Sequence, residues 1–188
     1  MAKSSLLYDF LRAKILPLDQ INAAIPAKGL IYDLGCGEGV ITKFLAKSTT
    51  RDIIGVDHDK KRLSQTEQAN LKFIAADITD FKIKNAEGIV ISDVLHHLNF
   101  KAQKKVLKNA SVGLTKTGIL VIKEIDKDEF LRSKLSRIWD LLLYPKDKIY
   151  YWRAQDLQKY LESIGFLVQV LRSCRIFPGS TTLFICKK

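Results

Sequence analysis

The sequence predicts an α/β fold in which a doubly wound parallel sheet carries helices on both faces. Short runs rich in β-branched residues alternate with segments of helical length, and this alternation is typical of parallel sheets. Two of the runs are almost continuously apolar, as expected for strands that are covered on both faces. A glycine-rich turn follows the first run, at the position where such folds bind ligands.

The candidate strands come in two groups. The parallel group consists of the runs 29–34, 52–57, 71–77, 88–93 and 118–125. The second group, 165–173 and 181–188, is separated only by the short segment CRIFPG, which cannot hold a crossover helix. We therefore expect an antiparallel pair at one edge of the sheet.

Three helices are predicted between the later strands. The segment 59–69 has Asp59 as its candidate N-cap, and the segment 100–113 begins after Asn99. The segment 154–164 places leucine and isoleucine on one face and ends at Gly165.

Two further segments are expected to lie around the ligand site. Residues 4–16 form an amphipathic helix that Pro17 ends, and residues 1–26 as a whole form a helical flap. This flap either packs on the domain or also covers the ligand. Residues 125–152 are a long aromatic insertion, and long insertions in compact domains are often functional, so we expect a lid.

Length and composition indicate one domain that spans residues 1–188. No apolar run approaches the roughly 18 residues that a membrane span needs. The N-terminal apolar stretch is interrupted by charges, so it does not resemble a signal peptide and a cytoplasmic location is expected. The three cysteines have no metal-site or disulfide spacing, and reduced thiols are expected. Composition leaves the oligomeric state open.

The chain is strongly basic, with a formal net charge of +11. Such a charge can attract nucleic acid or an anionic substrate. The lysines are scattered, however, with local clusters only at 60–62 and 101–108. We therefore favour solvated helix faces, and nucleic acid stays a second, less favoured partner.

The glycine-rich turn lies in the stretch LIYDLGCGEGV, residues 30–40. A dinucleotide-binding turn has the pattern G-x-G-x-x-G, which would need a third glycine at Val40 or at Thr42. The pattern fails in both registers. The pattern that is present is D-x-G-x-G-x-G, in which the carboxylate of Asp33 suits a ligand that carries an ammonium and a sulfonium group better than a pyrophosphate.

The motif YDLGCGEG resembles motif I of the class I S-adenosylmethionine-dependent methyltransferases. Further family landmarks follow in order, namely IIGVDHD, FIAADITDF, VISDVLHHL and GILVIKEI. The resemblance covers residues 30–187 and implies a seven-stranded sheet of order 3-2-1-4-5-7-6 whose last strand is antiparallel. It also implies S-adenosyl-L-methionine as cofactor and S-adenosyl-L-homocysteine as product.

The resemblance assigns cofactor-binding roles along the chain. Asp57 would accept the ribose hydroxyls with His58 as an exposed neighbour, Asp77 would lie by the adenine amino group, and Ile78 beside the ring. The full set of expected cofactor-binding residues is Asp33, Gly35, Cys36, Gly37, Gly39, Asp57, His58, Asp77, Ile78, Ser92 and Asp93. At Cys36 the backbone, and not the sulfur, would face the ligand.

The candidate catalytic residues are His96 and His97, which follow the fourth strand. The DVLHHL motif resembles a family version in which the second histidine, here His97, is the recurrent one. His97 either removes a proton from the acceptor or hydrogen-bonds nearby backbone and shapes the pocket. No metal is expected, because adjacent histidines diverge and no third ligand has suitable spacing.

The acceptor is expected to be a small-molecule or lipid-like metabolite that is methylated at oxygen, in preference to nitrogen or carbon. Trp139, Tyr144, Lys123 and Arg153 are the candidate substrate-binding residues, with Glu124 and Arg132 as further polar groups. The family element [N/D]-P-P-[Y/F] for base N-methylation is absent from the sequence. Two alternatives stay open: an RNA-modifying methyltransferase, and a protein that binds S-adenosylmethionine without turnover.

Overall fold

The structure is a computed structural model that describes residues 16–64, 66, 68–128, 148–173 and 181–188. The expected helix over 4–16 lies outside this part of the chain except for Leu16, and so do Arg132, Trp139, Tyr144 and Cys174. Only the two ends of the expected lid over 125–152, residues 125–128 and 148–152, are described.

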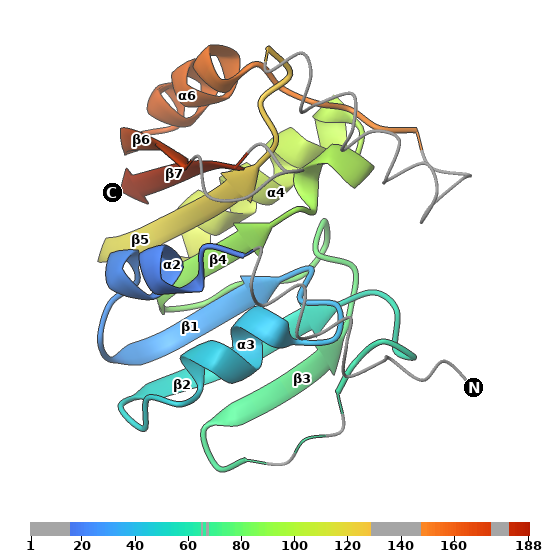
Figure 1. The fold of residues 1–188 in the computed structure, drawn as a ribbon, viewed down its shortest axis with the longest axis vertical. Helices are drawn as coiled ribbons and strands as arrows, with labels where there is room; N and C mark the ends of the chain where they lie inside the picture. Colours follow the sequence, from blue (N-terminus) through green and yellow to red (C-terminus); the bar gives the residue numbers. More distant parts are fainter. Residues whose placement is uncertain (1–15, 65, 67, 129–147, 174–180) are drawn as a thin grey trace.

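Seven strands form one sheet whose order is β3-β2-β1-β4-β5-β7-β6 (Figure 1). The strands are β1 Gly29–Leu34, β2 Arg51–Asp57, β3 Leu71–Ala75, β4 Ala86–Ser92, β5 Leu114–Glu124, β6 Leu167–Ser173 and β7 Thr181–Lys187. The strands β1 to β5 are parallel to one another, whereas β7 is antiparallel to both β5 and β6. The predicted fold class and strand order are confirmed.

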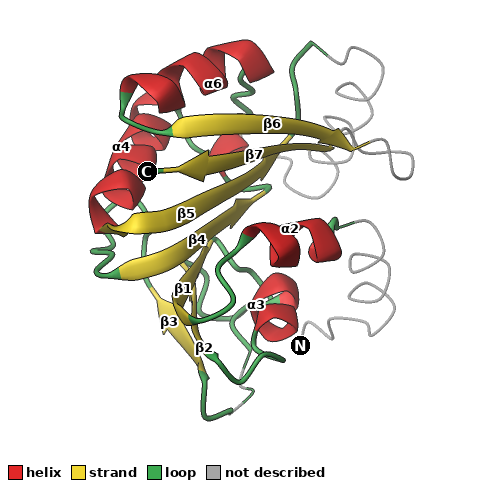
Figure 2. Ribbon diagram, turned by 90° about the vertical axis from the view of Figure 1, so that its left-hand side faces the viewer, coloured by secondary structure: helices red, strands yellow, loops and turns green. Residues whose placement is uncertain are grey.

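Helices cover both faces of this sheet (Figure 2). On one face lie α4 (Phe100–Gly113) and α6 (Ala154–Ser163), and on the other lie α2 (Leu18–Ala24) and α3 (Val40–Leu45). Alternate strand residues point to opposite faces, so the strands divide their apolar side chains between two cores. In β1, for example, Leu34 packs with the α4 and α6 face, whereas Ile31 packs with the α2 and α3 face.

The two long helices begin and end as the sequence predicts. The Asn99 side chain accepts a hydrogen bond from the backbone N–H of Ala102 at 3.0 Å, which caps the start of α4. After α6 the backbone enters a left-handed conformation at Gly165, whose φ is 96°. Glycine adopts this conformation without the steric cost that a side chain would add.

The short helix α2 lies within the range 1–26 that was expected to form a helical flap, but as a separate helix after Pro17 it was not predicted. It has only seven residues after Pro17, too few for a helical period to stand out. Its C-terminal end is held by Arg51, whose guanidinium donates to the carbonyl of Pro26 at 2.8 Å and to Oδ1 of Asn22 at 2.5 Å. Burial lowers the pKa of this guanidinium from its ordinary value.

The predicted helix over 59–69 is wrong for the residues that the structure describes there. Asp59 accepts from the backbone N–H of Lys61 at 2.9 Å, and its carbonyl accepts from Arg62, which closes a single turn. The chain then reaches Asn70, whose side-chain amide donates to three backbone carbonyls, those of Ala46, Ser48 and Arg51. The Asp59 side chain therefore closes a turn with nearby backbone, which an N-cap pattern in the sequence does not distinguish from the start of a helix.

None of the helices in the described ranges is long and apolar enough to cross a membrane.

Candidate functional site

The glycine-rich turn joins β1 to α3 at the carboxyl end of the central strand. Gly35, Gly37 and Gly39 have φ values of 75°, 55° and 78°, which is the left-handed region that favours glycine. Protein atoms already occupy the space that side chains would need. A Cβ at Gly35 would lie 2.3 Å from Val94, and one at Gly39 would lie 2.6 Å from the Phe73 ring.

The middle glycine has a cationic neighbour. A Cβ on Gly37 would lie 2.8 Å from a guanidinium nitrogen of Arg62, so the arginine side chain reaches over the turn. The three glycines therefore serve two purposes. They set the backbone conformation of the turn, and they allow side chains from other segments to pack directly against it.

Asp33 stands one residue before the end of β1 and is 2% exposed. Its Oδ2 atom accepts a hydrogen bond of 2.6 Å from the hydroxyl of Thr42 in the first turn of α3. This bond connects the strand before the turn with the helix after it. Thr42, which breaks the dinucleotide pattern, thus helps to fix the carboxylate at the carboxyl end of β1.

Asp57 ends β2 beside the turn and is 4% exposed. Its Oδ2 accepts from the backbone N–H of Gly37 at 2.8 Å, and its Oδ1 accepts from that of Asp59 at 2.9 Å. A carboxylate can accept about four hydrogen bonds, so each oxygen retains capacity for a ligand donor. His58 lies next to it with its side chain 81% exposed.

Cys36 lies behind the turn, on the side of Gly55. Burial raises the pKa of its thiol far above the ordinary value, and the negative charges of Asp33 and Asp57 raise it further. The thiol is therefore protonated at neutral pH and has little nucleophilic character.

The two candidate cofactor-binding residues that follow β3 differ in their exposure. Asp77 is exposed and accepts from the backbone N–H of Thr79 at 2.8 Å, which makes it the first residue of a turn. Ile78 is 7% exposed and belongs to the core on the α4 and α6 face.

A short ion pair joins the carboxyl ends of β4 and β5. The ammonium of Lys123 lies 2.5 Å and 2.7 Å from the two carboxylate oxygens of Asp93. Lys123 is 6% exposed, and Asp93 has a φ of 55°, an uncommon conformation for a residue with a side chain. Ser92 precedes this pair at the end of β4 and is buried. The structure thus brings together a residue expected to bind cofactor and one expected to bind substrate.

The two histidines lie in a 3-10 turn, η1 (Leu95–His97), directly after this pair. His96 is 3% exposed, and its Nδ1 lies 2.7 Å from Oε2 of Glu124. The other oxygen of Glu124 accepts from the backbone N–H groups of Val94 at 3.1 Å and Leu95 at 2.8 Å. His97 is half-buried, and its ring centroid lies 4.3 Å from that of His96.

The end of the insertion, residues 150–152, packs across these histidines. The backbone N–H of Tyr150 donates to the carbonyl of His96 at 2.8 Å, and the Tyr151 ring lies 5.3 Å from the His96 ring. Gln103 of α4 donates to the Tyr150 carbonyl at 3.0 Å and accepts from the indole N–H of Trp152. This segment is therefore fixed to the same turn.

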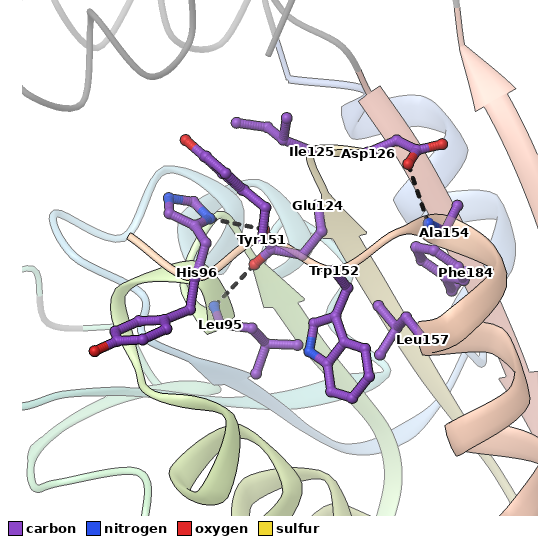
Figure 3. A pocket seen from close by; sticks show the side chains of 11 residues that line it. Leu95, His96, Glu124, Ile125, Asp126, Tyr151, Trp152, Ala154, Leu157 and Phe184 are labelled. Atoms are coloured by element: carbon purple, nitrogen blue, oxygen red, sulfur yellow. Dashed lines mark hydrogen bonds and ion pairs between the residues drawn. The ribbon is translucent and has the colours of Figure 1, made fainter. Parts of the chain in front are cut away.

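This segment helps to line a small pocket (Figure 3). Among the residues that line it are Leu95, His96, Glu124, Asp126, Trp152 and Phe184. Arg153, a candidate substrate-binding residue, lies at the surface, where its Nε is 3.4 Å from Asp128. In the described residues no group of three or more histidine, cysteine or acidic side chains could hold a metal ion.

Thr42 and Gln103 did not emerge from the sequence as site residues, and Glu124 was expected to face the acceptor. Gln103 and Glu124 contact partners that are distant in the chain, which no local spacing indicates. Thr42 contacts Asp33, nine residues before it, across the glycine-rich turn. One signal was available for Glu124: an acidic residue directly after the buried apolar run of β5 needs hydrogen-bond donors nearby.

Chemically, the site presents carboxylates at the ends of β1 and β2, which suit a cationic ligand. Next to them is the turn η1 with the imidazoles of His96 and His97, and an imidazole can serve as a proton acceptor or donor.

Comparison with known proteins agrees with this chemistry. Residues 31–118 match the family described as methyltransferase domain. Carboxy-S-adenosyl-L-methionine synthase of Staphylococcus epidermidis is 29% identical over 109 residues, which are 55% of this chain and 48% of that protein. The enzyme of the same name from Shewanella sediminis is 28% identical over 130 residues, 62% of this chain and 54% of that protein. The chain spans about half the length of these curated relatives.

Solved structures show the same fold. Magnesium protoporphyrin IX methyltransferase from Synechocystis PCC 6803, solved with bound S-adenosylhomocysteine, has a TM-score of 0.76 at 17% identity, over 100% of this chain and 90% of that one. A methyltransferase dependent on S-adenosylmethionine from Archaeoglobus fulgidus has a TM-score of 0.73 at 14% identity, over 98% of this chain and 100% of that one.

Proposed function

We propose that the chain is a class I S-adenosylmethionine-dependent methyltransferase and that it methylates a small-molecule or lipid-like metabolite at a hydroxyl oxygen; the family match over residues 31–118 and the strand order of the sheet support the first part. The observation that carries the proposal is the turn after β1. There three glycines in left-handed conformations lie between the buried carboxylates of Asp33 and Asp57. This is the topological switch point of the sheet, where open α/β folds bind ligands.

Asp33, Asp57 and the backbone of Gly35 and Gly37 would hold S-adenosylmethionine. When bound, this cofactor supplies an electrophilic methyl group on a positively charged sulfur. The two carboxylates create a negative potential that suits the ammonium and sulfonium groups of such a ligand. The capacity that remains on the oxygens of Asp57 suits ribose hydroxyls as donors.

We assign His97 as the base that removes the proton of the acceptor hydroxyl. A hydroxyl becomes a good nucleophile only when a base within hydrogen-bond reach removes its proton. His97 is half-buried at the carboxyl end of β4, whereas Nδ1 of the neighbouring His96 is engaged with Glu124 inside the fold. Alignment of acceptor and methyl group supplies much of the remaining rate enhancement in such a displacement.

The first test is a thermal shift measurement with S-adenosylhomocysteine, S-adenosylmethionine and NADH. We expect the first two to raise the melting temperature and NADH to leave it unchanged, because only a ligand that binds the native state stabilises it. Asp57→Asn should remove most of the shift, measured from that variant's own ligand-free melting temperature. Asp52→Asn, an exposed position on the same strand, is the matched control. Stabilisation by NADH alone would refute the proposal.

A second candidate function comes from the curated relatives, whose names describe synthesis of carboxy-S-adenosyl-L-methionine. In that case the cofactor itself would be the molecule that is modified. Mass spectrometry of small molecules that co-purify with the protein separates the two. Carboxy-S-adenosylmethionine in the released fraction supports the second function. Accumulation of S-adenosylhomocysteine together with a methylated acceptor supports the first.

A further inference from the structure

Glu124, at the end of β5, makes three contacts to the turn that follows the neighbouring strand β4 and contains η1. One carboxylate oxygen accepts from the backbone N–H groups of Val94 and Leu95, and the other lies 2.7 Å from Nδ1 of His96 (Figure 3). The side chain of Glu124 is 7% exposed. Burial of a carboxylate costs free energy unless the group is hydrogen-bonded, and these three partners of Glu124 are all in the segment 94–96.

The carboxylate replaces a missing helix cap. The N-cap position of η1 is Val94, which has no side-chain hydrogen-bond acceptor, and the N–H groups at the start of the turn need one. Glu124 supplies it from β5. Because a carboxylate only accepts, His96 carries a proton on Nδ1, and when the ring is neutral Nε2 is its basic nitrogen.

Several parts of the site depend on this turn. The Val94 side chain packs directly against Gly35 of the glycine-rich turn. The backbone N–H of His97 donates to the carbonyl of Val94 at 3.1 Å, and that of Tyr150 donates to the carbonyl of His96. A displacement of η1 would therefore move the glycine-rich turn, the candidate base and the end of the insertion together.

We propose that Glu124 is a positioning residue, which holds η1 in place and sets the tautomer of His96, and thereby orients His97 and the segment 150–152. In this role it acts through the groups of η1, to which its three contacts go. The expected effect on turnover rests on the proposed methyl transfer, whereas the effects on the tautomer and on the turn do not.

The decisive variant is Glu124→Gln, which keeps the shape of the side chain. The glutamine carbonyl can still accept from Leu95, but its amide N–H faces Nδ1 of His96. The ring must then carry its proton on Nε2. Nitrogen NMR of histidine-labelled protein should show that the protonated ring nitrogen of His96 changes from Nδ1 to Nε2. Amide hydrogen exchange at Leu95 should become about tenfold faster or more, because its hydrogen bond to a charged group is weakened. Exchange at Tyr150 should rise with it, because its acceptor is the His96 carbonyl of the same turn.

Glu87→Gln is the matched control, because Glu87 lies at the opposite end of β4 and accepts from the hydroxyl of Thr115 at 3.1 Å. It should leave both the histidine signals and the exchange at Tyr150 unchanged. For Glu124→Gln we also expect kcat to fall at least tenfold more than KM changes, with partial rescue in Glu124→Asp. An unchanged His96 tautomer, or an inverted tautomer with unaltered exchange at Tyr150, overturns the proposal. Because neither readout needs cofactor, a protein that binds no S-adenosylhomocysteine would contradict the proposed function alone.

Discussion

At the scale of single residues, Thr42 links the two ends of the glycine-rich turn. Its hydroxyl donates to Asp33, and both side chains are almost completely buried. Thr42→Val keeps the shape but removes the donor, which should lower the free energy of unfolding by about 2 kcal/mol, since hydrogen bonds to charged groups contribute that much. Binding of S-adenosylhomocysteine, measured by calorimetry, should weaken with it. Thr42→Ser, which retains the hydroxyl, is the control, and equal affinity in all three proteins would contradict this role.

The cysteines provide a second prediction at this scale. Burial raises the pKa of both described thiols, that of Cys36 most strongly and that of Cys186 to about 12. Because the thiolate is the reactive form, both should resist iodoacetamide at pH 8 in the native protein and react fully after denaturation. Their reactivity should rise only at a pH well above that of an ordinary cysteine. Peptide mass spectrometry reads each position separately, and rapid native labelling of Cys36 would show that the turn opens.

At the scale of elements, α2 depends on one buried cation. Arg51 also donates to the carbonyls of Asn22 at 3.3 Å and Ile25 at 3.4 Å, so its guanidinium satisfies the end of the helix. Arg51→Met leaves these acceptors without a donor and should lower the free energy of unfolding in urea by about 3 kcal/mol. Arg172→Met, at an exposed arginine 3.7 Å from Asp126, should change it by less than about 0.5 kcal/mol. Similar losses in both variants would argue against this role for Arg51.

At the scale of the whole molecule, the sequence predicted most of the features that hydrophobic periodicity, capping residues and glycine positions indicate. The strands, the Asn99 cap and the Gly165 end were available because each leaves a signal within a few residues. The strand order required the resemblance to a family. Contacts such as Arg51 with α2, Asn70 with three backbone carbonyls, and Glu124 with η1 join residues that are distant in the chain. No local pattern carries them, so α2 as a separate helix after Pro17 was not predicted.

The end of β5 places opposite charges on consecutive residues. Lys123 and Glu124 point to opposite faces of the sheet, where the first meets the Asp93 carboxylate and the second meets backbone N–H groups. A slip of β5 by one residue against β4 would, in one direction, bring the Glu124 carboxylate to Asp93 and, in the other direction, bring the Lys123 ammonium to the N–H donors of η1. The first sets two negative charges against each other, and the second sets a positive charge against the positive ends of N–H dipoles. The pair Lys123 and Glu124 therefore selects the register of the strand that joins the parallel and antiparallel parts of the sheet, and excludes the nearest misfolded alternatives.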